Sequence, residues 1–181
     1  MKRLAAVLDL VPLAGGGFLL LERTMPNWYA RLRYPLQYDA IVVGHARNYD
    51  LDPALLAAVI YRESKFDPKA KSKSGAIGLM QLLPSTAKGI ALHTGGTRFR
   101  VEDLYDPEIN VRYGAFYLRR LLRKYGDERL ALAAYNAGQA NVDAWLAAGR
   151  GIEFAETREY VHKVLAAREI YARAYSRELG G

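Results

Sequence analysis

The chain has 181 residues, of which 51% are hydrophobic and 25% are charged, and its formal net charge is +7. These values are typical of one globular domain with a short extension, and the length is sufficient for a packed core. The charge favours anionic partners, whereas the absence of cysteine excludes a disulfide framework, a zinc-thiolate cluster and a thiol nucleophile.

The first segment, residues 1–21, is predicted to be a signal peptide or a membrane anchor. A basic start precedes an apolar stretch, residues 4–21, which as a helix would span about 27 Å. A hydrocarbon core is about 30 Å thick, and Asp9 opposes insertion, so spanning is marginal. Cleavage after Gly16 would leave an apolar mature end, which favours an uncleaved anchor. The arginines that follow the segment oppose an anchor whose C-terminal end lies outside the cytoplasm, because positive charge usually gathers on the cytoplasmic side. The remaining alternative is that the segment is an ordinary buried helix.

Residues 22–35 contain prolines and aromatic residues without clear periodicity, so they are predicted to be a linker or an irregular lead-in that packs on the domain. The main domain is expected over residues 36–181. Its first helix has about four turns and ends near Asn48. Asp52 and Pro53 then supply an N-cap side chain and a proline at the first helical position.

A second helix is therefore predicted over residues 54–64, and its apolar spacing places Glu63 on or beside the buried face. Val59 and Ile60 precede Glu63 by four and three positions, so the three side chains share one side of the helix. A charged group there is unfavourable unless it is paired or functional. Glu63 is thus the first candidate functional residue.

The remaining chain also predicts helices. Pro84 opens a short helix to about Ala91, and Asp106-Pro107 starts a long one that runs to Tyr125 and stops at Gly126. Two shorter helices are expected at residues 130–135 and 142–148, and a final long helix at residues 155–177. No run alternates as a strand should over a useful length. The predicted fold class is all-α, or nearly so.

A glycine-rich turn follows Glu63 at residues 74–81, with the sequence Ser-Gly-Ala-Ile-Gly-Leu-Met-Gln. A carboxyl group that is partly sheltered from water resists ionisation and therefore suits a proton donor to a glycosidic oxygen. Gly75 and Gly78 allow the backbone to approach a sugar without an obstructing Cβ. The plainer interpretation is that both glycines only form a turn.

Four blocks in this order resemble the catalytic domain of the soluble-type lytic transglycosylases (SLT domain), lysozyme-like relatives of goose-type lysozyme. They are Tyr-Arg-Glu-Ser at 61–64, the glycine-rich turn at 74–81, Ala-Tyr-Asn-Ala-Gly at 134–138 and Glu-Thr-Arg-Glu-Tyr-Val at 156–161. The resemblance covers about residues 36–178. It implies a lysozyme-like helical domain that cleaves the β-1,4 bond between N-acetylmuramic acid and N-acetylglucosamine in peptidoglycan. It also implies that Glu63 acts first as acid and then as base on the C6 hydroxyl, giving a 1,6-anhydro sugar without consuming water.

The same resemblance implies that further residues bind the glycan: Ser72, Met80, Gln81, Tyr135, Asn136 and Glu156. Met80 is expected to line the cleft, Tyr135 to orient Glu63 or the substrate carbonyl, and Asn136 to contact an N-acetyl group. A core tyrosine, a capping asparagine and a carboxylate at a helix N-terminus are the plainer explanations. Tyr160 is assigned no role beyond packing.

A second catalytic carboxylate would distinguish a hydrolase from a transglycosylase. Goose-type lysozymes have an aspartate two positions after the glutamine of the turn, where this chain has Leu83, but Glu156 and Asp67 remain substitutes. The alternative functions are a lysozyme-type muramidase and a wall-binding module without turnover.

The expected partner is the glycan strand of peptidoglycan, outside the cytoplasm, with the protein anchored to the membrane or secreted. Lysines at positions 65, 69, 71 and 73 surround the turn and either attract anionic stem peptides or wall polymers, or are merely solvated. No nucleic-acid motif accompanies the basic residues, so no nucleic acid is expected. No metal and no cofactor are expected, because the three histidines are far apart in the chain.

Overall fold

The computed structural model describes residues 25–96 and 98–180, so the predicted signal peptide or anchor lies outside the described residues. In these ranges the elements are α2 (Asn27–Arg33), α3 (Asp39–Asn48), α4 (Pro53–Ser64), α5 (Pro84–Thr94), the 3-10 helix η1 (Val101–Tyr105), α6 (Pro107–Tyr125), α7 (Glu128–Ala137), α8 (Gln139–Ala147) and α9 (Ala155–Ala174). Extended pairing in the same ranges is limited to isolated bridges between Lys71 and Ile77 and between Ile77 and Leu82. The all-α prediction is confirmed.

Local start and stop signals set several helix boundaries as predicted. The Asp52 side chain accepts a hydrogen bond of 2.8 Å from the Ala54 amide, and Asp106 caps α6 through the Ile109 amide at 3.0 Å. Gly126 ends α6 in the left-handed conformation, with a φ of 64°. Each of these residues satisfies backbone groups that a helix end leaves unpaired.

The lead-in is more regular than predicted, because its centre forms α2. Seven residues are too short for a helical period to be recognised, and Pro26 stands at the N-cap position. The segment does pack on the domain: Ala30 is fully buried, and the Tyr175 hydroxyl donates to the Tyr34 carbonyl at 3.0 Å. The 3-10 helix η1 was likewise not predicted. In the part of the chain that the structure describes, no helix has the length and apolar character to cross a bilayer.

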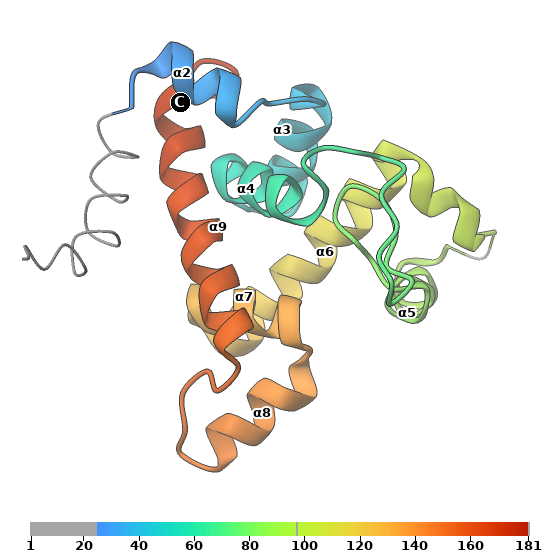
Figure 1. Ribbon diagram of the computed structural model, residues 1–181. Coiled ribbons are helices and arrows are strands. Elements are labelled where there is room, and N and C mark those ends of the chain that lie inside the picture. Colours follow the sequence, from blue (N-terminus) through green and yellow to red (C-terminus); the bar gives the residue numbers. More distant parts are fainter. Residues whose placement is uncertain (1–24, 97, 181) are drawn as a thin grey trace, which may run out of the picture.

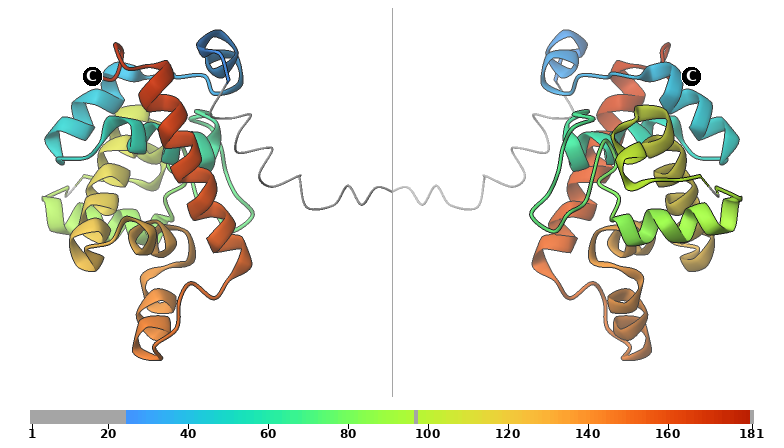
Figure 2. Two further views of the ribbon diagram at one scale, coloured as in Figure 1. Left: turned by 90° about the vertical axis from the view of Figure 1, so that its left-hand side faces the viewer. Right: turned by 90° about the vertical axis from the view of Figure 1, so that its right-hand side faces the viewer.

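Helix α4 is the centre of the main core and carries Glu63 in its last turn. Every residue from Ala54 to Tyr61 is buried, so the helix has no solvent face over two turns. Helix α9 packs along it, with α2 at the C-terminal end of α9 and α7 at the N-terminal end, whereas α8 projects from the rest of the domain (Figures 1 and 2). A helix enclosed in this way gives Glu63 a rigid base.

Candidate active site

A cleft of about 490 Å³ opens beside the end of α4 and is lined by residues from all four blocks, the glycine-rich turn among them. Its lining comprises Glu63, Ser72, Ser74, Ala76, Gln81, Leu82, Leu83, Thr86, Tyr117, Tyr135, Asn136, Ala137, Gly138 and Glu156. Segments that are far apart in sequence therefore meet at one place. All predicted site residues except Met80 line this cleft.

The carboxyl group of Glu63 is held and sheltered at the cleft wall. The hydroxyl of Tyr160 donates a hydrogen bond of 2.6 Å to Glu63 Oε1. Burial raises the pKa of Glu63 from 4.5 to about 7, although the Tyr160 hydrogen bond and the charge of Arg62 act in the opposite direction. The group therefore keeps its proton near neutral pH, as a general acid must.

Tyr135, which lines the cleft, and Tyr160, which contacts Glu63, have tasks different from those expected. The Tyr135 hydroxyl donates to the Met80 carbonyl at 2.8 Å and so holds the end of the glycine-rich turn, whereas Tyr160 is the residue that orients Glu63. Burial and the nearby Glu63 charge raise the pKa of both tyrosines well above the usual value, so both remain neutral donors. Tyr160 does pack in the main core, as expected, but its hydroxyl has the further role of binding Glu63.

Met80 does not line the cleft, which corrects the expectation drawn from the resemblance. Its side chain is fully buried and lies over Gly114 of α6, where a Cβ would stand 2.2 Å from the Met80 sulfur. The methionine contributes its backbone instead, since its carbonyl accepts from Tyr135. The Met80 side chain reaches the core because the glycine-rich turn lies very close to α6. Only a glycine at position 114 of α6 permits this close approach.

Ser72 and Gln81 form hydrogen bonds within the protein, and Gln81 also has a polar atom that is available to a ligand. Ser72 Oγ accepts from the Ala76 amide at 3.0 Å, and Gln81 Nε2 donates to the carbonyls of Ala70 and Gly78 at 3.1 and 2.9 Å. These bonds rigidify the cleft wall and leave the Gln81 carbonyl oxygen for a ligand. The structure thus brings both side chains into the cleft without showing what they bind.

Asn136 of α7 and Glu156 of α9 also line the cleft. Thr157 donates to Asn136 Oδ1 at 2.8 Å, so the amide nitrogen of Asn136 is the group available to a ligand. Glu156 is exposed and is the other carboxyl residue of the cleft lining. Asp67 is absent from that lining, and Leu83 occupies part of it with 42% of its surface exposed. Of the two substitute carboxylates, only Glu156 is in the cleft.

Asn110 was missed by sequence reasoning, although it fixes the glycine-rich turn. It is fully buried, its Oδ1 accepts from the Met80 amide at 2.8 Å, and its Nδ2 donates to the carbonyls of Ile77 and Leu104 at 2.9 and 2.8 Å. Gly78 is required beside it, because a Cβ there would lie 2.2 Å from Asn110 Nδ2. The available signal was an asparagine within the apolar stripe of the long helix.

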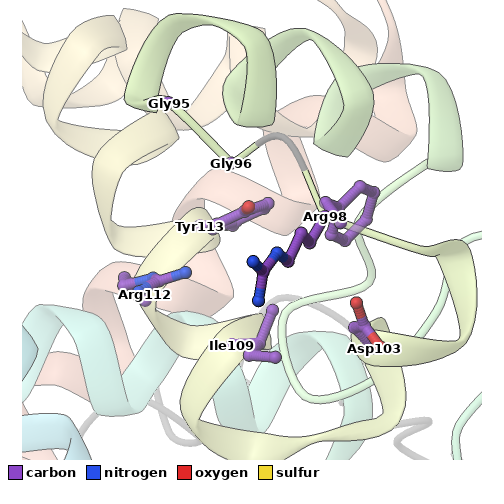
Figure 3. Close-up of a pocket in the computed structure, with 8 residues that line it drawn as sticks. Gly95, Gly96, Arg98, Asp103, Ile109, Arg112 and Tyr113 are labelled. Atoms are coloured by element: carbon purple, nitrogen blue, oxygen red, sulfur yellow. The ribbon is translucent and has the colours of Figure 1, made fainter.

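A second depression, of about 370 Å³, lies at the C-terminal end of α5, the end opposite the catalytic cleft (Figure 3). Arg98, Asp103 and Arg112 are its charged residues, and Phe99 and Tyr113 pack together there with ring centroids 5.3 Å apart. It holds none of the predicted site residues. Within the described ranges, no three metal-ligating side chains cluster at this depression or at the cleft.

Replacing Tyr160 by Phe is expected to lower kcat roughly ten- to a hundredfold, because a hydrogen bond to the ionised Glu63 is lost. The same loss should raise the pKa of Glu63 above its present value of about 7, since the hydrogen bond lowers it. The pH at which activity declines should shift upward with it. Tyr171→Phe is the matched control, because Tyr171 is buried on the same helix but donates to the Pro35 carbonyl. Equal effects from both variants would contradict a positioning role for Tyr160.

Comparison with known proteins places the chain in a family. Residues 42–156 match the model of the transglycosylase SLT domain family. The soluble lytic murein transglycosylase of Salmonella typhimurium is 38% identical over 151 residues, covering 74% of this chain and 23% of that protein. The membrane-bound lytic murein transglycosylase E of Buchnera aphidicola is 34% identical over 107 residues, covering 58% of this chain and 44% of that protein.

Solved structures of lytic transglycosylases have the same fold. An inactive mutant of Slt from Pseudomonas aeruginosa superposes with a TM-score of 0.74 at 35% identity, covering 81% of this chain and 25% of that chain. The 70 kDa soluble enzyme of Escherichia coli gives a TM-score of 0.73 at 34% identity, covering 79% and 25%. The chain spans about a quarter of the length of these soluble relatives. Because the family model matches well over half of the sequence, this chain belongs to the transglycosylase SLT domain family.

Proposed function

We propose that this domain is a peptidoglycan lytic transglycosylase that cleaves the β-1,4 bond between N-acetylmuramic acid and N-acetylglucosamine and leaves 1,6-anhydro ends. The observation that carries the proposal is the sheltered Glu63 carboxyl in a sugar-sized cleft, with its pKa raised to about 7 and one tyrosine hydroxyl bound to it. Family membership and the names of the relatives support the same activity.

The proposed reaction uses Glu63 twice. The protonated carboxyl gives its proton to the glycosidic oxygen as the bond to the anomeric carbon breaks, which leaves positive charge on the sugar ring. The resulting carboxylate, stabilised by the Tyr160 hydrogen bond, takes a proton from the C6 hydroxyl. The C6 oxygen then bonds to the anomeric carbon. Glu63 ends the cycle protonated, and no water enters the product.

Hydrolysis of the same bond is the second candidate function, and the presence of Glu156 in the cleft favours its consideration. A water-activating base opposite the acid would give a reducing muramic end instead of an anhydro end. Digestion of purified sacculi in ¹⁸O-labelled water, followed by mass spectrometry, separates the two. The transglycosylase gives unlabelled ends that are lighter by one water, whereas the hydrolase gives labelled reducing ends. Sedimentation with sacculi without any product would instead indicate a wall-binding module.

The pH dependence of kcat/KM is expected to follow the protonation of Glu63 in the free enzyme. Since burial raises the pKa of this carboxyl from 4.5 to about 7, the active protonated form persists up to neutral pH. Above that value kcat/KM should fall about tenfold per pH unit. Steady-state rates on soluble glycan strands between pH 4 and 9 test this. A decline already centred near the ordinary glutamate pKa would contradict the proposed role of burial.

We also propose that the domain acts outside the cytoplasm, where its substrate is found, and that residues 1–21 either anchor it to the membrane or direct its secretion. The basis is the apolar segment 4–21 in the sequence, together with relatives that are named both soluble and membrane-bound. Membrane fractionation and N-terminal sequencing of the mature protein distinguish an anchor from a cleaved signal.

A further inference from the structure

Helix α2 carries an apolar face that points away from the protein. Trp28, Tyr29 and Leu32 are 71%, 43% and 74% exposed, so this short helix holds three of the eight large apolar side chains that are exposed in the part of the chain that the structure describes. Trp28 and Leu32 lie two positions on either side of the fully buried Ala30, and at about 100° per residue they stand roughly opposite it. Exposed apolar side chains that gather in one place mark an interaction surface.

This face is held in a fixed position on the domain. The Tyr175 hydroxyl donates to the Tyr34 carbonyl at 3.0 Å and accepts from the Leu36 amide at 3.1 Å, which fastens the C-terminal end of α2. The Arg31 side chain forms an ion pair of 2.7 Å with Glu178. A partner that binds the apolar face therefore also orients the domain. Because the arginine is already paired, apolar contact rather than charge is the main attraction that the face offers.

The place of the face in the sequence indicates a membrane surface as its partner. The apolar segment 4–21, proposed above to anchor the domain or direct its secretion, precedes α2, and the six steps from Leu21 to Asn27 span at most about 22 Å. Tryptophan and tyrosine are enriched at membrane–water interfaces, where the ring is apolar and the polar group stays hydrated. A second copy of the chain fits less well, since a standard interface takes about 20 to 30 residues a side.

Resting on the proposed function and its membrane anchor, we propose that Trp28, Tyr29 and Leu32 insert into the interface of the membrane from which the chain emerges. An amphipathic helix that lies in this interface buries its apolar face by about 5–10 Å. Helix α2 packs at the C-terminal end of α9, whereas Glu156 of the cleft lies at the N-terminal end (Figures 1 and 2). Twenty residues of helix are about 30 Å long, so contact through α2 separates the cleft from the bilayer by a distance on the order of the length of α9.

Tryptophan fluorescence tests the contact in the full chain. The chain has two tryptophans, and Trp145 is buried against Phe154, so Trp28→Phe protein reports the emission of Trp145 alone. Both proteins are reconstituted into vesicles of phosphatidylcholine, which has no net charge, with bromine near the headgroup end of the acyl chains. Bromine quenches an indole only at short range. The matched variants are Leu32→Ser and Leu92→Ser, because Leu92 is 84% exposed on α5, apart from α2 (Figures 1 and 2).

Quenching by bromine is expected to be at least about twofold greater in the wild type than in Trp28→Phe, because Trp28 reaches the depth of the bromine. Leu32→Ser should lower the Trp28 quenching at least about twofold, since one leucine is a large share of a three-residue contact, and Leu92→Ser should leave it unchanged. At about 1 M salt, where the Debye length is about 3 Å, the quenching should persist, because the contact is apolar. All the variants should cleave soluble glycan strands at the wild-type rate, since α2 contributes no residue to the cleft lining.

Equal quenching in the wild type and in Trp28→Phe would overturn the inference. Protein that floats with the vesicles without Trp28 quenching would refute the contact alone, whereas protein that does not float would refute the anchor and the contact together. Protection of Trp28 from acrylamide in water, without quenching by bromine, would assign the face to residues 4–21 or to a second copy, and sedimentation in detergent at several concentrations separates these two. An equal loss in Leu92→Ser would indicate a nonspecific effect. Quenched Trp28 in a protein that cleaves no strand would refute the proposed enzymatic function and support the membrane contact.

Discussion

Glu63→Gln is expected to reduce glycan cleavage by at least about 10²- to 10⁴-fold, because the amide has no proton to donate and cannot later accept one as a carboxylate. Glutamine has nearly the same shape, and its amide oxygen can still accept the Tyr160 hydroxyl hydrogen bond that reaches Glu63 Oε1 in the wild type. Binding of strands should therefore persist. Initial rates of release of anhydro ends, together with sedimentation on sacculi, measure the two effects. Substantial cleavage by the variant would eliminate Glu63 as the acid.

The same variant is expected to be more stable than the wild type at high pH. The pKa of Glu63 is about 7 in the folded protein, against 4.5 for an ordinary glutamate, so the folded state holds the proton more tightly. The stabilisation from this proton is complete below about pH 4.5 and is lost as the pH rises through about 7. Ionisation in the sheltered site then costs up to about 3 kcal/mol of unfolding free energy. Glutamine does not ionise, so urea unfolding should give similar stabilities at pH 4 and a more stable variant at pH 8.

An equal stability of the two proteins at pH 8 would mean that water reaches the Glu63 carboxyl freely and that burial does not raise its pKa. A control for the stability comparison must not disturb the turn. Gln81→Glu is unsuitable, because it would remove two hydrogen bonds that the Gln81 side chain donates within the turn. Glu102→Gln serves instead: it makes the same chemical change in η1 and outside the cleft lining, and it should leave the pH dependence of stability as in the wild type.

Helix positions were predictable where the responsible residues are neighbours in sequence. Asp52 with Pro53 and Asp106 with Pro107 set the starts of α4 and α6 by local hydrogen bonds and a fixed proline φ, so these boundaries are confirmed within a residue or two. Asp127 caps α7 in the same way, yet the helix was predicted to begin at position 130 because the first apolar residue was taken as its start.

The parts of the site that sequence reasoning missed depend on partners far apart in the chain. Tyr160 reaches Glu63 across 97 positions, and no local pattern distinguishes it from a tyrosine that only fills the core. Met80 was expected in the cleft from the family resemblance, but the side chains of a turn point in different directions, and that of Met80 enters the core over Gly114. The residue types of the site were therefore predictable, whereas their division between substrate contact and support was not.

Asn110→Ala is expected to destabilise the domain by roughly 3 to 5 kcal/mol, the largest effect anticipated for a residue outside the cleft lining. The substitution leaves the Met80 amide and the carbonyls of Ile77 and Leu104 buried without their present partner, and each unsatisfied group costs about 1 to 3 kcal/mol. Urea unfolding monitored by circular dichroism measures the loss. Asn141→Ala is the matched control, because its exposed side chain makes one bond to Ala137 and its removal should change stability by less than about 0.5 kcal/mol.

The glycine-rich turn should lose its position together with this stability, because Asn110 holds the turn at the Ile77 carbonyl and the Met80 amide. At a temperature where Asn110→Ala remains folded, kcat on glycan strands should therefore fall even though Glu63 and Tyr160 are unchanged. A variant that loses stability but keeps full activity would show that the Tyr135 and Ser64 hydrogen bonds, to the carbonyls of Met80 and Leu79, are sufficient to place the turn. A variant as stable as Asn141→Ala would show that water replaces the lost amide at little cost, which a fully buried position does not favour.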